Sequence, residues 1–139
     1  MAEVAKGQPV SYSSLTPPQS ATINGLIAAE AIAAGDACYI DTASSPPGRV
    51  KKASGAAADN TVSVVAGFAF QDASADDPVT LVTEGNFRYA AALTPGTRLF
   101  LSGTVAGGLA DAASTGGTVP IAYAIDATRI RIVPAGLFV

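Results

Sequence analysis

Asn86-Phe87-Arg88-Tyr89-Ala90 is the stretch of sequence that decides the fold class. Aromatic and polar side chains alternate along it with a period of two, which is typical of a strand with one buried face. An earlier stretch, Gly25 to Gly35, aligns with Asn86 to Gly96 at an offset of 61 residues. Taken alone, Leu26 to Ala34 looks helical, because alanine and glutamate are good helix formers. Because Asn86 to Ala90 shows the clearer pattern, we predict a strand for both stretches.

The alignment continues in the same order through the rest of both copies. Its offset falls from 61 to 51 residues, so ten residues are missing from the second copy, all from polar or small-residue stretches where loops shorten. We therefore predict two tandem copies of one β-rich unit, residues 25–85 and 86–136, within a single domain, residues 25–139. The alternative is a chance agreement between two β-rich segments of similar composition. The further matched blocks are Cys38–Ile40 with Leu99–Leu101, Lys51–Ser54 with Asp111–Ser114, Gly67–Gln71 with Ala122–Asp126, and Val79–Val82 with Ile130–Val133.

Short apolar segments bounded by Gly, Pro, Ser or Asp predict the remaining strands. Many short strands at this spacing are typical of a small all-β barrel or sandwich. We therefore expect an all-β fold, a small barrel or sandwich of two similar β modules with an extended N-terminal arm. The further predicted strands are residues 37–41, 49–53, 62–71, 79–83, 98–102, 119–125 and 129–133.

The first 24 residues match neither copy. Three prolines and the lack of a helical or long strand period predict an extended or polyproline-like arm, residues 1–24. Such an arm is either a disordered tail or a strap laid over a neighbouring molecule. A solvated tail does not need the apolar side chains that this segment carries. The candidate partner-binding residues are therefore Tyr12, Leu15, Pro17, Pro18 and Ile23.

The composition bounds the classes of function. With 139 residues the chain is long enough for one domain with a real core. Histidine is absent and Cys38 is the only cysteine, so no Ser/His/Asp or Cys/His triad, no histidine-containing zinc site and no internal disulfide can form. We therefore expect no enzyme, no cofactor and no small-molecule substrate. A net charge of -3 also argues against a sequence-independent nucleic-acid binder, which needs a basic stripe.

Nothing in the sequence reads as a targeting or membrane segment. Met1 to Val10 lacks the apolar core of a signal peptide, and Glu30 and Asp36 interrupt the most apolar stretch. We therefore expect a protein made in a cytoplasm, without a membrane partner. The single unpaired cysteine agrees with a reducing compartment.

Two clusters of charged residues have both a functional and a structural interpretation. Asp72, Asp76 and Asp77 could supply oxygen ligands to calcium, but the D-x-D-x-D-G order is missing, which favours a solvated acidic turn. The basic cluster of the sequence is either a solvated strand face or a docking site for an anionic protein. It consists of Arg49, Lys51 and Lys52.

Cys38 and the paired glycines favour structural roles. Cys38 aligns with Leu99, which favours a small buried hydrophobe over a nucleophile. Gly107-Gly108 and Gly116-Gly117 lack the P-loop pattern and indicate hairpin turns.

Ala31 to Ile40, Val65 to Ala69 and Leu93 to Ser102 together resemble the small head decoration (cement) proteins of tailed bacteriophages. The likeness extends through Gly107-Gly108-Leu109, Ile121 to Ala124 and Arg129 to Ile132, which is nearly the whole chain after the arm. The matching positions are mostly turn glycines and apolar strand positions.

The resemblance implies a structural virion protein on the outer surface of the head. It implies a capsid-stabilising role in which the protein, commonly a homotrimer, clamps adjacent subunits of the major capsid protein. An N-terminal extension that reaches across the capsid surface is also implied, and no catalytic residue is.

Two other classes of function stay open. One is a carbohydrate- or receptor-binding β module of a phage fibre or spike. The other is a degenerate hydrolase, because two of the eleven acidic residues could converge.

Overall fold

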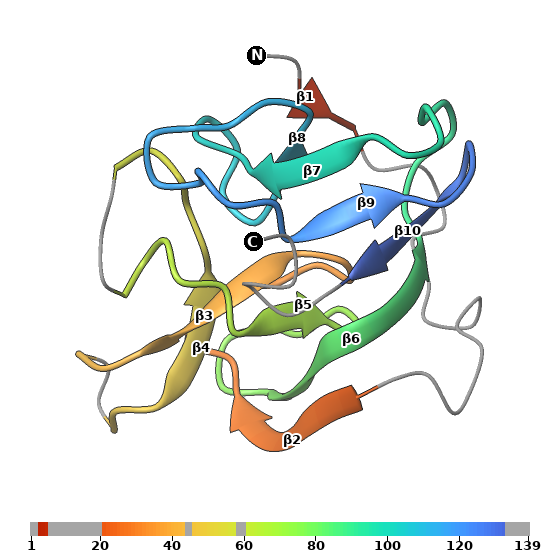
Figure 1. The fold of residues 1–139 in the computed structure, drawn as a ribbon. Helices are drawn as coiled ribbons and strands as arrows, with labels where there is room; N and C mark the ends of the chain where they lie inside the picture. Colours follow the sequence, from red (N-terminus) through yellow and green to blue (C-terminus); the bar gives the residue numbers. More distant parts are fainter. Residues whose placement is uncertain (1–2, 6–20, 44–45, 58–60, 133–139) are drawn as a thin grey trace.

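The computed structural model describes residues 3–5, 21–43, 46–57 and 61–132. It is all-β, with 0% helix and 43% strand, and its strands form one antiparallel sheet curled into a half-barrel (Figure 1). The all-β prediction is confirmed. The strands are β1 (Glu3–Val4), β2 (Ala21–Ile27), β3 (Ala37–Asp41), β4 (Arg49–Lys52), β5 (Gly67–Ala69), β6 (Pro78–Arg88), β7 (Arg98–Leu101), β8 (Leu109–Ala110), β9 (Ala122–Ala124) and β10 (Arg129–Ile132).

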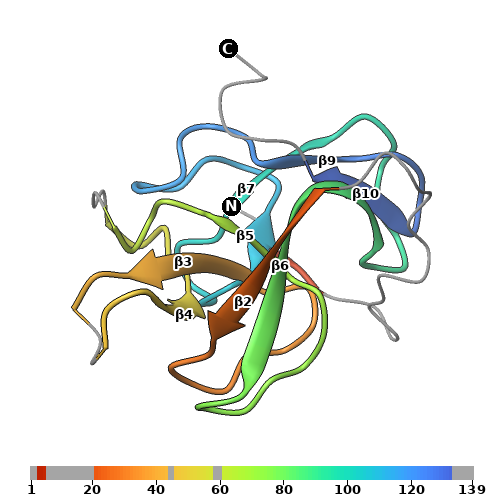
Figure 2. The same cartoon turned by 90° about the horizontal axis from the view of Figure 1, so that it is seen from below.

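The strand order in the sheet is β1-β8-β7-β9-β10-β6-β5-β3-β4. Strand β2 lies off this path and pairs with β6, beside which it runs in Figure 2. Because β6 has eleven residues, it can pair with β2 and β5 through its first part and with β10 through its last part. Strand β6 therefore joins the two halves of the sheet.

The predicted strand over Leu26 to Ala34 is wrong for most of its length. Strand β2 ends at Ile27, and beyond it only isolated bridges form, from Ala28 to Val50 and from Ile32 to Ala73. The chain has to reverse before it enters β3, and it does so in a turn where Gly35 has a φ of 86°. Local propensity favoured a helix and the aligned copy favoured a strand. Instead this segment forms a turn, because the chain must reverse to enter β3.

The other strand predictions differ from the structure mainly in length. Strands β3, β4, β7 and β10 lie where the sequence predicts them. The prediction over residues 62–71 is too long, because only Gly67–Ala69 is strand, and the two-residue β8 was not predicted. The alternation at Asn86–Arg88 does mark a strand, but one that is continuous with the predicted 79–83.

The apolar side chains form two cores. The larger, which we call the central core, lies between the two halves and is built around Phe68, Phe87, Tyr89, Leu101 and Ile130. The smaller, which we call the first-half core, contains Cys38, Val50, Val79 and Leu81 beneath the sheet formed by β2 to β6. Side chains alternate between the two cores along β3 and β5, because successive residues of a strand point to opposite faces. These strands therefore bury both faces.

Candidate protein-interaction site

The structure places one of the five candidate partner-binding residues. Ile23 lies in β2, pairs in register with Leu81 of β6, and leaves 38% of its surface exposed. It is thus an exposed apolar residue on a strand that the body of the protein holds in place. Tyr12, Leu15, Pro17 and Pro18 lie outside the described residues.

The described ends of the expected arm are both extended and both pair with the body. Strand β1 pairs with β8 through Glu3↔Ala110 and Val4↔Leu109, and Ala21 to Ile23 pair with β6. The hydroxyl groups of Ser102 and Thr104 donate hydrogen bonds to the Glu3 carboxylate. These contacts tie β1 to the edge strand of the second half. They leave residues 6–20 as the connection between β1 and β2.

The acidic loop, which we define as residues 72–77, uses its carboxylates to hold its own shape. Asp72 Oδ1 accepts a hydrogen bond from the Ala34 amide at 2.8 Å, and Asp77 Oδ2 accepts one from the Ser74 amide at 3.1 Å. Asp76 forms an ion pair with Arg49. Among the described residues, no three His, Cys, Asp or Glu side chains are grouped so as to hold a metal ion. The loop is a folded acidic turn whose carboxylates also reach solvent.

The basic residues of β4 are close to acidic groups of the same half. Lys51 Nζ lies 3.4 Å from Asp41 Oδ2, and the hydrogen bond to this carboxylate raises the pKa of Lys51. The backbone amide of Lys52 donates to Glu30 Oε2 at 2.8 Å. These contacts favour the interpretation of this segment as a strand edge with local ion pairs.

Cys38 is a buried core residue, as the alignment with Leu99 predicted. It is fully buried, and its thiol donates a hydrogen bond of 3.3 Å to the backbone oxygen of Asp36. Burial without a base to deprotonate it keeps a thiol unreactive.

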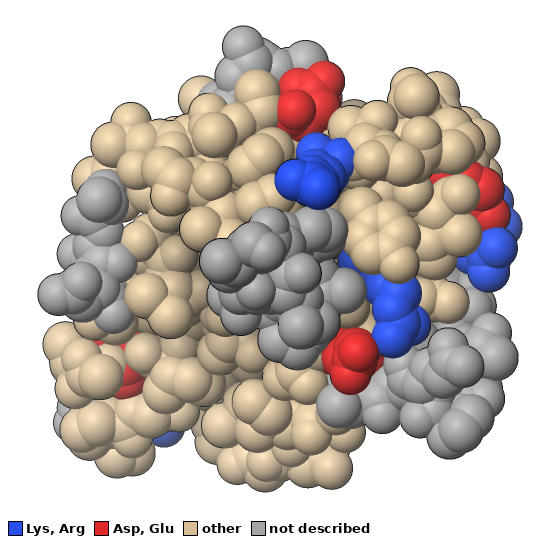
Figure 3. All heavy atoms as spheres, in the orientation of Figure 1, with Lys and Arg blue, Asp and Glu red and all other residues tan. Residues whose placement is uncertain are grey.

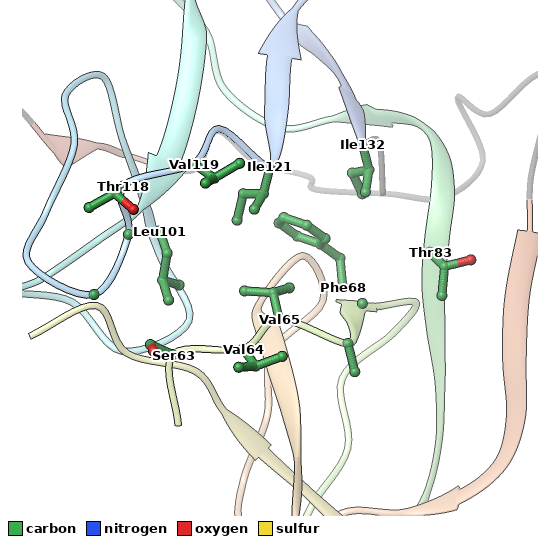
Figure 4. A pocket seen from close by; sticks show the side chains of 14 residues that line it. Ser63, Val64, Val65, Phe68, Thr83, Leu101, Thr118, Val119, Ile121 and Ile132 are labelled. Carbon is green, nitrogen blue, oxygen red and sulfur yellow. The ribbon is translucent and has the colours of Figure 1, made fainter. Parts of the chain in front are cut away.

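A cavity of about 410 Å³ opens between the two halves of the sheet (Figure 4). Side chains from both halves point into it, among them Val65 and Phe68 from the first half and Leu101, Ile121 and Ile132 from the second. Val64 and Val119, which are among the exposed large hydrophobic residues, also line it. None of the fourteen described residues that line it is charged. The cavity can therefore bind apolar groups but offers no charged acid or base to a reacting substrate.

A second surface, which the sequence alone did not reveal, lies on the outer side of β7, β9 and β10. We call it the outward face and define it as Arg98, Phe100, Tyr123 and Arg131. Arg98 pairs in register with Tyr123, and Tyr123 pairs with Arg131, so these three residues form one row across three strands. The intervening residues of β7 and β10 point into the central core. The alternation in Arg98-Leu99-Phe100-Leu101 and Arg129-Ile130-Arg131-Ile132 was the signal that could have found this face.

Hydrogen bonds hold the cationic groups near this face in defined positions. Arg131 Nη1 donates to Asn86 Oδ1 at 3.1 Å, and Arg131 Nη2 donates to Glu84 Oε2 at 3.2 Å. At the neighbouring turn, Asp126 accepts hydrogen bonds from the amides of Thr128 and Arg129 and from the Arg129 side chain, which lower its pKa to about 2. Arg131 of the outward face and the neighbouring Arg129 are therefore held in place by hydrogen bonds.

Neither a protein-family model nor a curated protein sequence matches this chain. Within the part of the chain that the structure describes, no helix could cross a membrane.

Proposed function

We propose that this protein is a structural virion protein that binds the outside of an assembled phage head and stabilises it by clamping adjacent subunits of the major capsid protein. The observation that carries the proposal is where the residues that resemble cement proteins lie in the fold. Ala31–Ile40 spans the Gly35 turn and β3, Leu93–Ser102 spans the Gly96 turn and β7, and Arg129–Ile132 is β10. The likeness thus falls on the framework of the half-barrel.

The proposal includes a body made of two tandem modules, residues 25–85 and 86–136, and matching strand pairings support it. The order β4-β3-β5-β6 in the first half corresponds to β8-β7-β9-β10 in the second. The register between the two central strands of each half also matches, because Cys38 pairs with Gly67 while the aligned Leu99 pairs with the aligned Ala122. The modules share β6, since the boundary at residue 85 falls inside that strand.

The turns that enter β3 and β7 support the same proposal. Gly35 and Gly96 both have a φ of 86°. The Gly35 amide donates to Ala69 O at 2.9 Å, and the Gly96 amide donates to the equivalent Ala124 O at 2.8 Å. This matched pair of hydrogen bonds supports a repeated unit over a chance agreement.

Physically, a cement protein acts by mass action. A protein that binds the expanded shell more tightly than its precursor shifts the equilibrium towards the expanded shell by its differential affinity. Many copies then need only modest affinity each. A rigid β body with a self-contained core fits the role of a protein that stabilises the expanded shell. In this proposal the protein lies on the outer surface of the head, after synthesis in the host cytoplasm, and acts as a homotrimer.

The proposed strap to the capsid is the connection between β1 and β2, which contains Tyr12, Leu15, Pro17 and Pro18. Because β1 and β2 pair with the body, deleting the whole N-terminus would also remove two strands. A sharper test replaces only residues 6–20 with a Gly/Ser segment of equal length. We expect the variant to keep the far-ultraviolet circular dichroism spectrum and melting temperature of the wild type, but to lose co-sedimentation with expanded heads of the phage that encodes it.

The matched control for this experiment is Val105→Ser, which changes an exposed apolar residue on the β7–β8 turn. We expect the control variant to bind heads like the wild type. Undiminished co-sedimentation of the Gly/Ser variant would show that the strap assignment is wrong. A wild-type protein that binds no heads, expanded or unexpanded, would contradict the proposed function itself.

The alternative, a carbohydrate- or receptor-binding module, is favoured by one observation. Phe100 and Tyr123 are half-buried on the outward face, where an aromatic ring could stack on a sugar. This function predicts saturable binding to a glycan that Tyr123→Ala abolishes. Titration of immobilised glycans by the wild type and this variant separates the two proposals.

A further inference from the structure

Three positions of the outward face are buried in the first module and exposed or half-buried in the second. By the alignment of the modules, Ala37, Tyr39 and Phe68 correspond to Arg98, Phe100 and Tyr123. The fourth position is compared by strand pairing rather than by the alignment. Val82 is the register partner of Phe68, as Arg131 is the register partner of Tyr123. The first-module residues are all in the central core, against the second module. The first module thus uses this face to dock, while in the second module the same face points outwards.

The outward face has the composition of an energetically important interface. Arginine and tyrosine are the residues, with tryptophan, that most often dominate binding energy between proteins. Arg98 is exposed, and Phe100, Tyr123 and Arg131 are half-buried around it. Lys and Arg side chains are visible over this part of the molecule in Figure 3. A carboxylate-bearing partner fits this arrangement, because a guanidinium group carries five N–H donors, of which the hydrogen bonds of Arg131 to Asn86 and Glu84 use two.

The charges of the two modules have opposite sign. Residues 25–85 contain eight acidic and three basic residues, whereas residues 86–136 contain two acidic and four basic residues. The acidic loop (72–77) immediately precedes β6, whose first residues lie at the bottom of Figure 1, while β7 and β9 lie in its upper half. The loop and the outward face of one molecule therefore lie at opposite ends. Their charges can meet only between two molecules.

The acidic loop is suited to such a contact. Its hydrogen bonds to Ala34 and within the loop fix its shape before binding, so that little conformational entropy is lost on association. Asp76 pairs with Arg49, yet 76% of its side chain remains exposed. We propose that the outward face of one copy of this protein binds the acidic loop of a second copy, head to tail.

This contact is heterologous, because two different surfaces meet, and such contacts build rings or open chains. The proposed function includes self-association, and this contact would be its interface. In this respect the inference rests on the proposed function. Its test needs no capsid, so its failure and the failure of head binding are distinguishable.

The test compares sedimentation velocity of the wild type and charge variants at low and high salt. We expect the weight-average mass of the wild type to rise with concentration at low salt and to fall towards 13.7 kDa when salt screens the charges. Arg98→Glu places like charges in the contact and should weaken association at least tenfold. Asp77→Lys should do the same from the other side. A mixture of the two variants should associate again, because the opposite charges are restored with their positions exchanged.

The matched control is Lys52→Glu, which makes the same change of net charge on β4. We expect it to associate like the wild type. Tyr123→Ser provides a second probe of the face that leaves all charges in place and should also weaken association. The proposal is overturned if the wild type is monomeric at every concentration, if Arg98→Glu associates like the wild type, or if Lys52→Glu weakens association as much as Arg98→Glu.

Discussion

At the scale of single residues, the polar groups of this protein serve mainly to hold turns and edges. Asp126 accepts four hydrogen bonds from Thr128 and Arg129 at the turn between β9 and β10. Ser102 is fully buried, and its hydroxyl oxygen accepts hydrogen bonds from the amides of Thr104 and Val105. Tyr89 is the exception, because its buried hydroxyl group has no hydrogen-bond partner among the described residues.

Because this hydroxyl group is buried without a partner in the part of the chain that the structure describes, we expect the substitution Tyr89→Phe to stabilise the protein, most of all at high pH. Burial, followed by the negative charges of Asp36 and Glu3, raises the pKa of Tyr89 above its usual value of 10.0. The folded state therefore keeps the proton while the unfolded state loses it, and stability decreases as the pH rises above about 10. Removing the hydroxyl group should abolish this contribution.

We expect Tyr89→Phe to be more stable than the wild type by about 1 kcal/mol at neutral pH, because a buried unsatisfied hydroxyl group costs ~1–3 kcal/mol. The difference should grow above pH 10. Urea unfolding at several pH values measures it, and Tyr123→Phe on the outer surface is the control. A Tyr89→Phe variant less stable than the wild type would indicate that the hydroxyl group has a partner.

At the scale of elements, β1 is one of the two shortest described strands and is held by contacts with residues far along the chain. It has two residues, and its partner β8 lies about a hundred positions further along the chain. Val4 packs partly buried against the central core, while Glu3 binds Ser102 and Thr104. Edge strands tend to pair with other chains unless something covers them, so β1 protects the edge of β8.

Val4→Asp should release β1 without unfolding the body. An aspartate cannot be buried against the core at low cost, while the remaining contacts of β1 are few. We expect faster amide hydrogen exchange at Leu109 and Ala110 in this variant, with exchange in β5 and β6 unchanged. Val105→Asp, on the exposed turn after β7, is the control. Equal protection of β8 in both variants would show that β1 contributes nothing to its edge.

At the scale of the whole molecule, the central core makes the two halves depend on each other. Phe68 belongs to β5 of the first half, yet its side chain packs with Leu101 and Ile132 of the second half. Strand β6 runs through both halves. We therefore expect the described body to unfold as one cooperative unit.

Phe68→Ala should destabilise both halves together, by about 3–5 kcal/mol, the usual cost of truncating a buried phenylalanine. Chemical denaturation should show a single transition at a lower denaturant concentration, with the same midpoint by circular dichroism and by tyrosine fluorescence. Val119→Ala, at the exposed rim of the cavity, should shift the midpoint only slightly. Two separate transitions in the wild type would contradict the shared core.

The sequence predicted the features of the fold that depend on neighbouring residues, namely the alternation along strands and the turns. Alternation and turn residues located β3, β4, β7 and β10, because a strand with one buried face shows its period in a few residues. The sequence did not reveal β8, whose two residues are too short to show any period. It also divided β6 at residue 85, since nothing local distinguishes one long strand from two short strands.

The candidate sites, too, were visible in the sequence only where they depend on single residues. Ile23 could be recognised as one of the apolar residues of the arm, whereas its strand partner on β6 could not. The outward face was missed because Arg98, Tyr123 and Arg131 lie on three strands and become neighbours only through sheet register.

By itself, then, the sequence determined an all-β chain without the residues for histidine-dependent chemistry. Only the tertiary structure decided that the halves share one core, that β1 covers β8, and which arginine and aromatic side chains stand together. The physical reason is that strand propensity and turns depend on neighbours along the chain, whereas register, edge coverage and the burial of a whole face depend on contacts between residues far apart in sequence.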